Sequence, residues 1–167
     1  MSSARDYYKS QNIRRVVCIT VLNENSVLSR ISGLFSARGY NIDSLTVAPI
    51  PQSEYSNITI VTNGNERVIN QIIKQLHKLI PVLKVNEHKD IIQKDTVLIK
   101  LPISSHLGEI DVLARSYNGS IQNVTSTCII LAATDDPQRI ANFIKVMQNY
   151  KPIEIIRSGV VAMQRDD

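Results

Sequence analysis

One succession of strand-forming and helix-forming patterns occurs twice along this chain of 167 residues. Short β-branched runs predict strands, and apolar residues recurring at every third or fourth position predict helices. In each half the order is strand, helix, strand, strand, helix, strand, which is the ferredoxin-like arrangement. The sequence therefore predicts an α+β protein built from two tandem ferredoxin-like βαββαβ modules.

The first module is expected to begin with a buried strand and to place its first helix after a polar turn. That helix is marked by apolar residues from Val27 to Phe35, and Gly39 follows it where a helix C-terminus favours glycine. Asn63-Gly64 is a turn dipeptide after the third strand. The expected helices cover 27–38 and 68–79, and the expected strands cover 14–22, 40–49, 57–62 and 82–85.

The second module repeats this layout. Asp135-Asp136-Pro137 is a typical helix start, because aspartates cap N-termini and proline is favoured at the first helical position. The expected strands cover 96–103, 120–125 and 128–133 with a last one within 152–163, and the helices cover 107–117 and 137 onward. Four residues recur at offsets of 72, 72, 72 and 71: Arg67, Asn70, Ile72 and Pro81 correspond to Arg139, Asn142, Ile144 and Pro152.

These elements divide the chain into a polar tail over 1–12, a first module over 13–88, a linker over 89–95 and a second module over 96–165. In the linker, Ile91 and Ile92 are able to extend a flanking strand instead. The tail has no hydrophobic signal core, and no apolar stretch approaches the roughly 20 residues of a membrane span. Two distant cysteines within apolar runs favour buried free thiols in a reducing, intracellular compartment: Cys18 and Cys128.

Composition and charge argue against a nucleic-acid-binding protein. The net charge is only +4, and no run of Lys or Arg exceeds two residues, whereas nucleic-acid-binding proteins usually concentrate positive charge. RNA-recognition domains share the βαββαβ order but carry aromatic residues on the third strand. The corresponding run 56–62 (SNITIVT) has none, with only Tyr55 beside it. RNA binding therefore stays as an alternative with little support.

The sequence shows no set of catalytic residues either. His77, His88 and His106 have no His or Cys neighbour at metal-ligand spacing. A nucleophile elbow, a phosphate loop and a dinucleotide-binding glycine motif are all missing. Asp135-Asp136 resembles a carboxylate pair, but its place before a proline gives both residues a helix-capping role. We therefore expect no catalytic site, metal or other cofactor in this chain, and an enzyme on the same fold is the less favoured interpretation.

The most informative segment runs over 21–47. The exposed backbone N–H groups of a helix N-terminus attract anions such as a carboxylate, and the side-chain amides of Asn23 and Asn25 both donate and accept hydrogen bonds. A zwitterionic amino acid needs that mixture. A second polar turn, Gly39-Tyr40-Asn41, lies at the opposite end of the same helix, so only two subunits packed side by side bring both turns to one ligand. Capping and turn formation remain the plainer explanation of these asparagines.

The run from Leu28 to Val47 (LSRISGLFSARGYNIDSLTV) resembles the signature of the small, regulatory subunit of acetolactate synthase, also called acetohydroxyacid synthase. Further similarity lies in 74–79 (KQLHKL), 82–85 and 157–160 (RSGV), and the resemblance extends from about residue 14 to residue 165. It implies that the first half is an ACT domain. The second half is then the family's own C-terminal domain, also ferredoxin-like.

The resemblance also implies a partner and an effector. Members of the family bind a larger catalytic subunit, raise its activity and make it sensitive to feedback by valine or a related branched-chain amino acid. The catalytic subunit holds thiamine diphosphate, magnesium and FAD. In such ACT homodimers the effector lies between two subunits. By position, and with Asn25 added for its amide, the effector-binding residues are Asn23, Asn25, Ser26, Val27 and Leu28 of one subunit facing Asn41 and Ile42 of the other.

Two positions depart from the family pattern, which usually has glycine in place of Ser26 and an acidic residue in place of Leu22. Glycine lets backbone approach a ligand closely. Ser26 can still cap the helix, but its Cβ is expected to crowd the effector, leaving weaker valine binding or a chain that mainly activates. An ACT-type sensor of another metabolic enzyme is the main alternative. The expected compartment is a bacterial cytoplasm or a plastid stroma.

Overall fold

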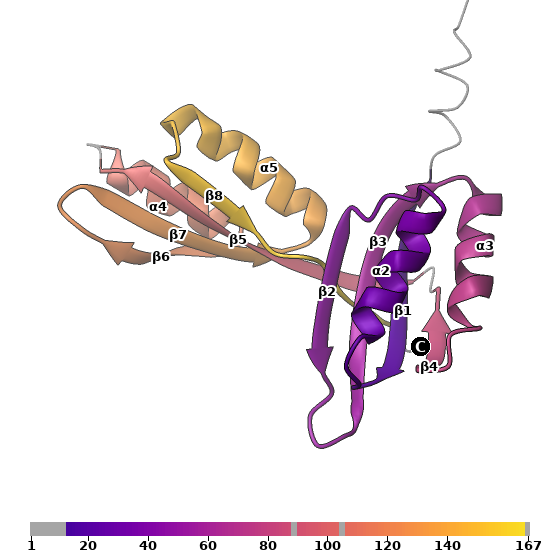
Figure 1. The fold of residues 1–167 in the computed structure, drawn as a ribbon. Helices are drawn as coiled ribbons and strands as arrows, with labels where there is room; N and C mark the ends of the chain where they lie inside the picture. The colour runs from indigo at the N-terminus through magenta and orange to yellow at the C-terminus, as the bar shows by residue number, and fades with distance from the viewer. Residues whose placement is uncertain (1–12, 88–89, 104–105, 166–167) are drawn as a thin grey trace, which may run out of the picture. The chain divides into compact units, whose positions relative to one another are not determined.

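The computed structural model describes residues 13–87, 90–103 and 106–165. The predicted N-terminal tail and His88 lie outside the described residues. The chain divides into two compact units, of which the first contains the described residues up to Ile91 together with Gln164 and Arg165, and the second contains Ile92–Met163. Figure 1 shows that each unit is built on a sheet with two α-helices.

The first unit is a four-stranded antiparallel sheet in which the strand order is β2-β3-β1-β4. Two helices pack on one face of this sheet (Figure 1). Its elements are β1 (Ile13–Leu22), α2 (Val27–Ala37), β2 (Ser44–Pro49), β3 (Tyr55–Gly64), α3 (Glu66–Leu76) and β4 (Val82–Asn86).

The core of the first unit lies on the face where β1 and β3 place alternate residues. Val17 pairs with Ile60, and Ile19 pairs with Ile58. All four side chains are at most 1% exposed. Because a slip of one residue would turn them to the other face, their burial fixes the register of the two strands. The helices cover them with Ile31 and Phe35 of α2 and with Ile72 and Leu76 of α3.

The second unit repeats the topology with the strand order β6-β7-β5-β8, and a further strand, β9, pairs with β5. Its core combines alternate residues of β5 and β7 with one face of each helix. The predicted α+β class and the twice-repeated βαββαβ order are therefore confirmed. Its elements are β5 (Ile91–Pro102), α4 (Leu107–Ser116), β6 (Gly119–Val124), β7 (Cys128–Asp135), α5 (Pro137–Met147), a 3-10 turn (Gln148–Tyr150), β8 (Glu154–Arg157) and β9 (Val161–Gln164).

Several predicted boundaries were wrong. Residues 91–95, assigned to the linker, form the start of β5. Residues 40–43 are not strand, because β2 begins later, and Asn63-Gly64 ends β3 instead of forming a turn. The last strand, expected within 152–163, is divided into β8 and β9. Strands extend past their apolar runs because backbone pairing with a neighbour satisfies N–H and C=O groups whatever the side chain.

The internal repeat holds at an offset of 71 residues in the second helix of each unit. Asn65 and Asp136 occupy the two N-cap positions, and each accepts a hydrogen bond on its side chain from a backbone N–H. The pairing of Ile72 with Ile144, and of the other helix residues at an offset of 72, was therefore wrong by one position. The buried residues show the correspondence: Ile69, Ile72 and Leu76 of α3 match Ile140, Phe143 and Met147 of α5.

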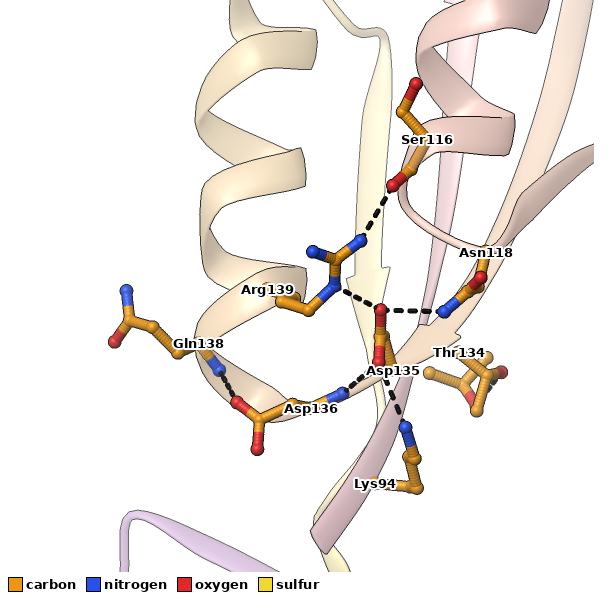
Figure 2. Close-up of polar contacts among 9 residues, drawn as sticks. Lys94, Ser116, Asn118, Thr134, Asp135, Asp136, Gln138 and Arg139 are labelled. Carbon is orange, nitrogen blue, oxygen red and sulfur yellow. Dashed lines mark hydrogen bonds and ion pairs between the residues drawn. The ribbon is translucent and has the colours of Figure 1, made fainter.

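Asp135 has a larger role than the helix capping predicted for it. It is the last residue of β7 and only 4% exposed. Its Oδ1 accepts hydrogen bonds from Lys94 Nζ at 2.9 Å and from the backbone N–H of Asp136 at 2.8 Å. Its Oδ2 accepts from Asn118 Nδ2 at 2.9 Å and from Arg139 Nε at 2.5 Å (Figure 2). One carboxylate thus joins β5, β7, α5 and the turn after α4.

The charge of Asp135 is balanced by several neighbours. Asp95 lies directly opposite it on β5, and two like charges facing each other across a sheet repel. Arg157 Nε contacts Asp95 Oδ2 at 2.6 Å, while Lys94 and Arg139 contact Asp135. Hydrogen bonds from Arg139 and Lys94 hold the pKa of Asp135 well below its usual value.

Replacing Asp135 with Asn is expected to lower the free energy of unfolding by about 2 kcal/mol at neutral pH, because hydrogen bonds to a buried charge are lost. The pKa of Asp135 is lower in the folded chain than in the unfolded chain. The contribution of ionised Asp135 to the free energy of unfolding is therefore complete at pH values above its pKa in the unfolded chain, near 3.8. It is lost as the pH falls below that pKa. Urea unfolding at a series of pH values should show the wild type and the variant converging in acid.

Asp111→Asn is the matched control for this prediction. Asp111 forms an ion pair with the exposed side chain of Arg115 in the same unit, and surface pairs of this kind contribute under about 1 kcal/mol. Equal losses in the two variants, or an Asp135 effect that does not shrink in acid, would contradict the role given to this carboxylate.

Candidate functional site

The first polar turn, residues 23–26, joins β1 to α2. The Asn23 backbone N–H donates to the Glu54 carbonyl at 2.9 Å, which ties the turn to the residue before β3. The side chains of Asn23, Asn25 and Ser26 are exposed. The turn therefore has an anchored backbone and presents its polar side chains to solvent.

The first two residues of α2 offer different groups to a ligand. Val27 is 5% exposed and belongs to the core, so it presents backbone and not its side chain. Leu28 is 41% exposed, and its side chain is accessible. The first turn of α2 has no acidic residue, so no negative side chain on it opposes an anion at the N–H groups of this helix end.

Ser26 has a backbone conformation that favours glycine. Its φ is +73°, in the left-handed region, where a Cβ costs roughly 1–2 kcal/mol. Side chains that cap a helix N-terminus need an extended backbone, and Ser26 makes no capping hydrogen bond with its side chain. Ser26 therefore does not cap α2 with its side chain, although the sequence allowed this. The structure adds a conformational reason for glycine at this position.

The second polar turn follows the other end of α2. Gly39 has a φ of +66°, as suits the residue after a helix C-terminus, and Tyr40 N donates to the Phe35 carbonyl at 2.9 Å. Ile42 is half-buried and packs against the core, whereas Asn41 is exposed. Of the two residues predicted here, Asn41 is thus the accessible one.

Asp43 was missed by reasoning from the sequence, although it contacts Asn41 directly. Asn41 Nδ2 donates to Asp43 Oδ1 at 2.5 Å, and the Asn63 side-chain amide donates to the other carboxylate oxygen. The Asn41 backbone carbonyl accepts from Thr62 Oγ1 at 2.7 Å. The β3 partners lie 20 and 21 residues further along the chain, so no local pattern points to this arrangement.

Helix α2 separates the two turns. It has 11 residues, which at 1.5 Å per residue makes it about 16 Å long. In Figure 1 it runs along the sheet with one turn at each of its ends. One chain therefore does not bring Asn23 and Asn41 together, and a ligand that contacts both turns needs two chains.

Among the described residues, no group of three or more His, Cys, Asp or Glu is placed to hold a metal ion. His77 is exposed at the end of α3. Cys18 and Cys128 are not joined in a disulfide, and each is half-buried rather than fully buried as expected. Burial raises the pKa of Cys18. In the described part of the chain, no helix is long and apolar enough to cross a membrane.

Both halves of the chain match family models. Residues 17–84 match the model described as the AHAS small subunit-like ACT domain, and residues 94–166 match the one described as the small subunit of acetolactate synthase. The chain belongs to the acetolactate synthase small-subunit family. The two matched segments correspond to the two structural units, so membership rests on both modules and the resemblance found in the sequence is confirmed.

Relatives in this family are similar over nearly their whole length. The acetolactate synthase small subunit of Buchnera aphidicola subsp. Schizaphis graminum is 39% identical over 160 residues, covering 92% of this chain and 99% of that protein. The isozyme 3 small subunit of Salmonella typhimurium is 38% identical over 159 residues, covering 93% and 98%. The crystal structure of the acetolactate synthase small subunit from Thermotoga maritima matches with a TM-score of 0.85 at 30% identity, covering 93% and 99%.

The alternatives that the sequence left open include an ACT-type sensor of another enzyme and an RNA-binding protein. Because the match spans both modules, an ACT-type sensor of an unrelated enzyme has no support. RNA-recognition domains carry stacking aromatic residues on the third strand. In β3 the only aromatic residue is Tyr55, at the first position.

Ser26→Gly is expected to raise the free energy of unfolding by about 1 kcal/mol, because glycine adopts a φ of +73° without the cost of a Cβ. Urea unfolding of the full chain measures this gain. If the Cβ also crowds the effector, calorimetry on the same variant shows tighter valine binding.

Ser26→Ala is the control, since it keeps the Cβ and removes only a hydroxyl group that makes no capping hydrogen bond. It should leave both stability and valine affinity close to those of the wild type. A Ser26→Gly variant that gains stability without gaining affinity would refute the crowding hypothesis.

Proposed function

We propose that this chain is the regulatory subunit of an acetolactate synthase, which binds the catalytic large subunit, raises its activity and makes it sensitive to feedback by valine. The observation that carries this proposal is the 37–39% identity, over an alignment that covers nearly the whole chain, to proteins named acetolactate synthase small subunits. In this proposal thiamine diphosphate, magnesium and FAD belong to the catalytic subunit. The complex works in a bacterial cytoplasm or a plastid stroma.

The proposed effector site lies between the ACT domains of a homodimer. The N-terminal end of α2 suits a carboxylate, because its N–H groups have no partner within the helix. The exposed side chain of Leu28 suits a branched aliphatic side chain, and the exposed amide of Asn41 suits an ammonium group. The full set is Asn23, Asn25, Ser26, Val27 and Leu28 from one chain and Asn41 and Ile42 from the other.

Regulation then follows from linkage. An effector shifts an equilibrium only by its difference in affinity for the two states, and coupling between two sites is typically about 1–3 kcal/mol. A site that takes residues from both chains binds valine well in one arrangement of the dimer and poorly in others. Bound valine therefore favours that arrangement, in which the catalytic partner is less active.

The test is an assay of acetolactate formation from pyruvate by a cognate catalytic subunit, with and without this chain and valine. The chain is expected to raise the rate, and valine is expected to reverse the increase. Asn23→Ala and Asn41→Ala should keep the activation but need about tenfold more valine for inhibition, because each loses hydrogen bonds to a charged group. Asn70→Ala, at an exposed position of α3, is the control and should behave like the wild type.

Two results of this assay would overturn different parts of the proposal. If the chain neither raises the rate nor forms a complex with the catalytic subunit, the regulatory role is wrong. If the chain activates but valine does not reverse the activation, the regulatory role stands and valine is not the effector.

A further inference from the structure

The side-chain amide of Asn41 has a fixed orientation. An asparagine amide can present either its N–H groups or its carbonyl oxygen to a ligand, and the neighbouring groups decide which. Asn41 Nδ2 lies 2.5 Å from Asp43 Oδ1. An ionised carboxylate only accepts hydrogen bonds, so the amide nitrogen must face Asp43. The carbonyl oxygen of this exposed amide accepts no hydrogen bond from the described residues.

The contact between Asn41 and Asp43 is anchored to the sheet at both of its ends. Asn63 donates to the second oxygen of Asp43, and the Asp43 N–H donates to the Val61 carbonyl at 2.8 Å. The backbone carbonyl of Asn41 accepts from Thr62 Oγ1, and Thr62 is 0% exposed. The amide is therefore held by three consecutive residues of β3, although the turn that carries it is exposed.

We propose that Asp43 is a positioning residue, which holds the Asn41 amide so that its carbonyl oxygen accepts a hydrogen bond from the ammonium group of a bound amino acid. The negative charge of Asp43 lies on the nitrogen side of the Asn41 amide, and it also attracts the ammonium group of the ligand. The inference rests on the proposed effector site. It adds to that site the residue that orients the Asn41 amide and so makes the site prefer an amine.

The test compares two ligands that differ at one group: valine, and 2-hydroxy-3-methylbutanoate, in which a hydroxyl group replaces the ammonium. Calorimetry on the full chain gives the ratio of their dissociation constants. Asp43→Ala is expected to weaken valine binding about tenfold and to change binding of the hydroxy acid by less than about twofold. A merely structural role would weaken both ligands alike, and Asp43→Asn serves the same comparison if the alanine variant does not fold.

Two controls accompany the calorimetry. Asp90→Ala removes an exposed carboxylate from the same unit and should leave the ratio unchanged. In NMR spectra, the Asn41 side-chain amide signal should shift in Asp43→Ala, because its nitrogen loses a charged acceptor, whereas the Asn70 amide signal should not shift.

An unchanged ratio of the two dissociation constants, an equal weakening of both ligands, or a wild-type chain that binds neither ligand would overturn the inference. These measurements use this chain alone. The regulatory role is decided separately, by activation of the catalytic subunit without any effector, so failure of the inference about Asp43 can be told apart from failure of the regulatory role.

Discussion

The antiparallel pairing of β1 with β3 over ten residues determines where the other parts of the first unit lie. At one end of this pair, the Asn23 N–H contacts the carbonyl of Glu54, just before β3. At the other end, Thr62 contacts the backbone of Asn41, and Asn63 contacts Asp43. Helix α2 covers the apolar residues between these ends. One strand therefore sets the position of both polar turns, and the buried Val and Ile side chains that fix its register also fix the distance between the turns.

The two units use the same fold with different interactions at equivalent places. At the offset of 71 residues, Gly64 of β3 stands where Asp135 stands in β7. A Cβ at Gly64 would lie 3.2 Å from Val68 Cγ1, so this end of the first sheet packs closely against α3. The same end of the second sheet holds two facing carboxylates and the Lys and Arg side chains that form ion pairs with them. The ferredoxin-like fold is thus compatible with either close apolar packing or a balanced set of charges at this end of the sheet.

Apolar periodicity predicted the helices and the central strands because it depends only on residues that are close in the sequence. Ile31 and Phe35, for example, belong to the apolar pattern that predicts α2, and both lie in the core. Strand ends were less predictable, since residues 91–95 become strand by pairing and not by composition. The exposed asparagines of the site followed from their chemistry and from family resemblance. The left-handed backbone of Ser26 was not predictable, because serine normally avoids it. Asp43 was not predictable either, because its partner Asn63 comes from a strand formed later in the chain.

The position of α2 between two polar turns has a genetic consequence. In the proposed homodimer each effector site takes one turn from each chain, so every chain contributes to both sites. A mixed dimer of a chain altered at Asn23 and a chain altered at Asn41 then has one site with both defects and one site with none. Two alleles that each impair sensing alone therefore complement each other when expressed together, which a site formed within a single chain cannot do.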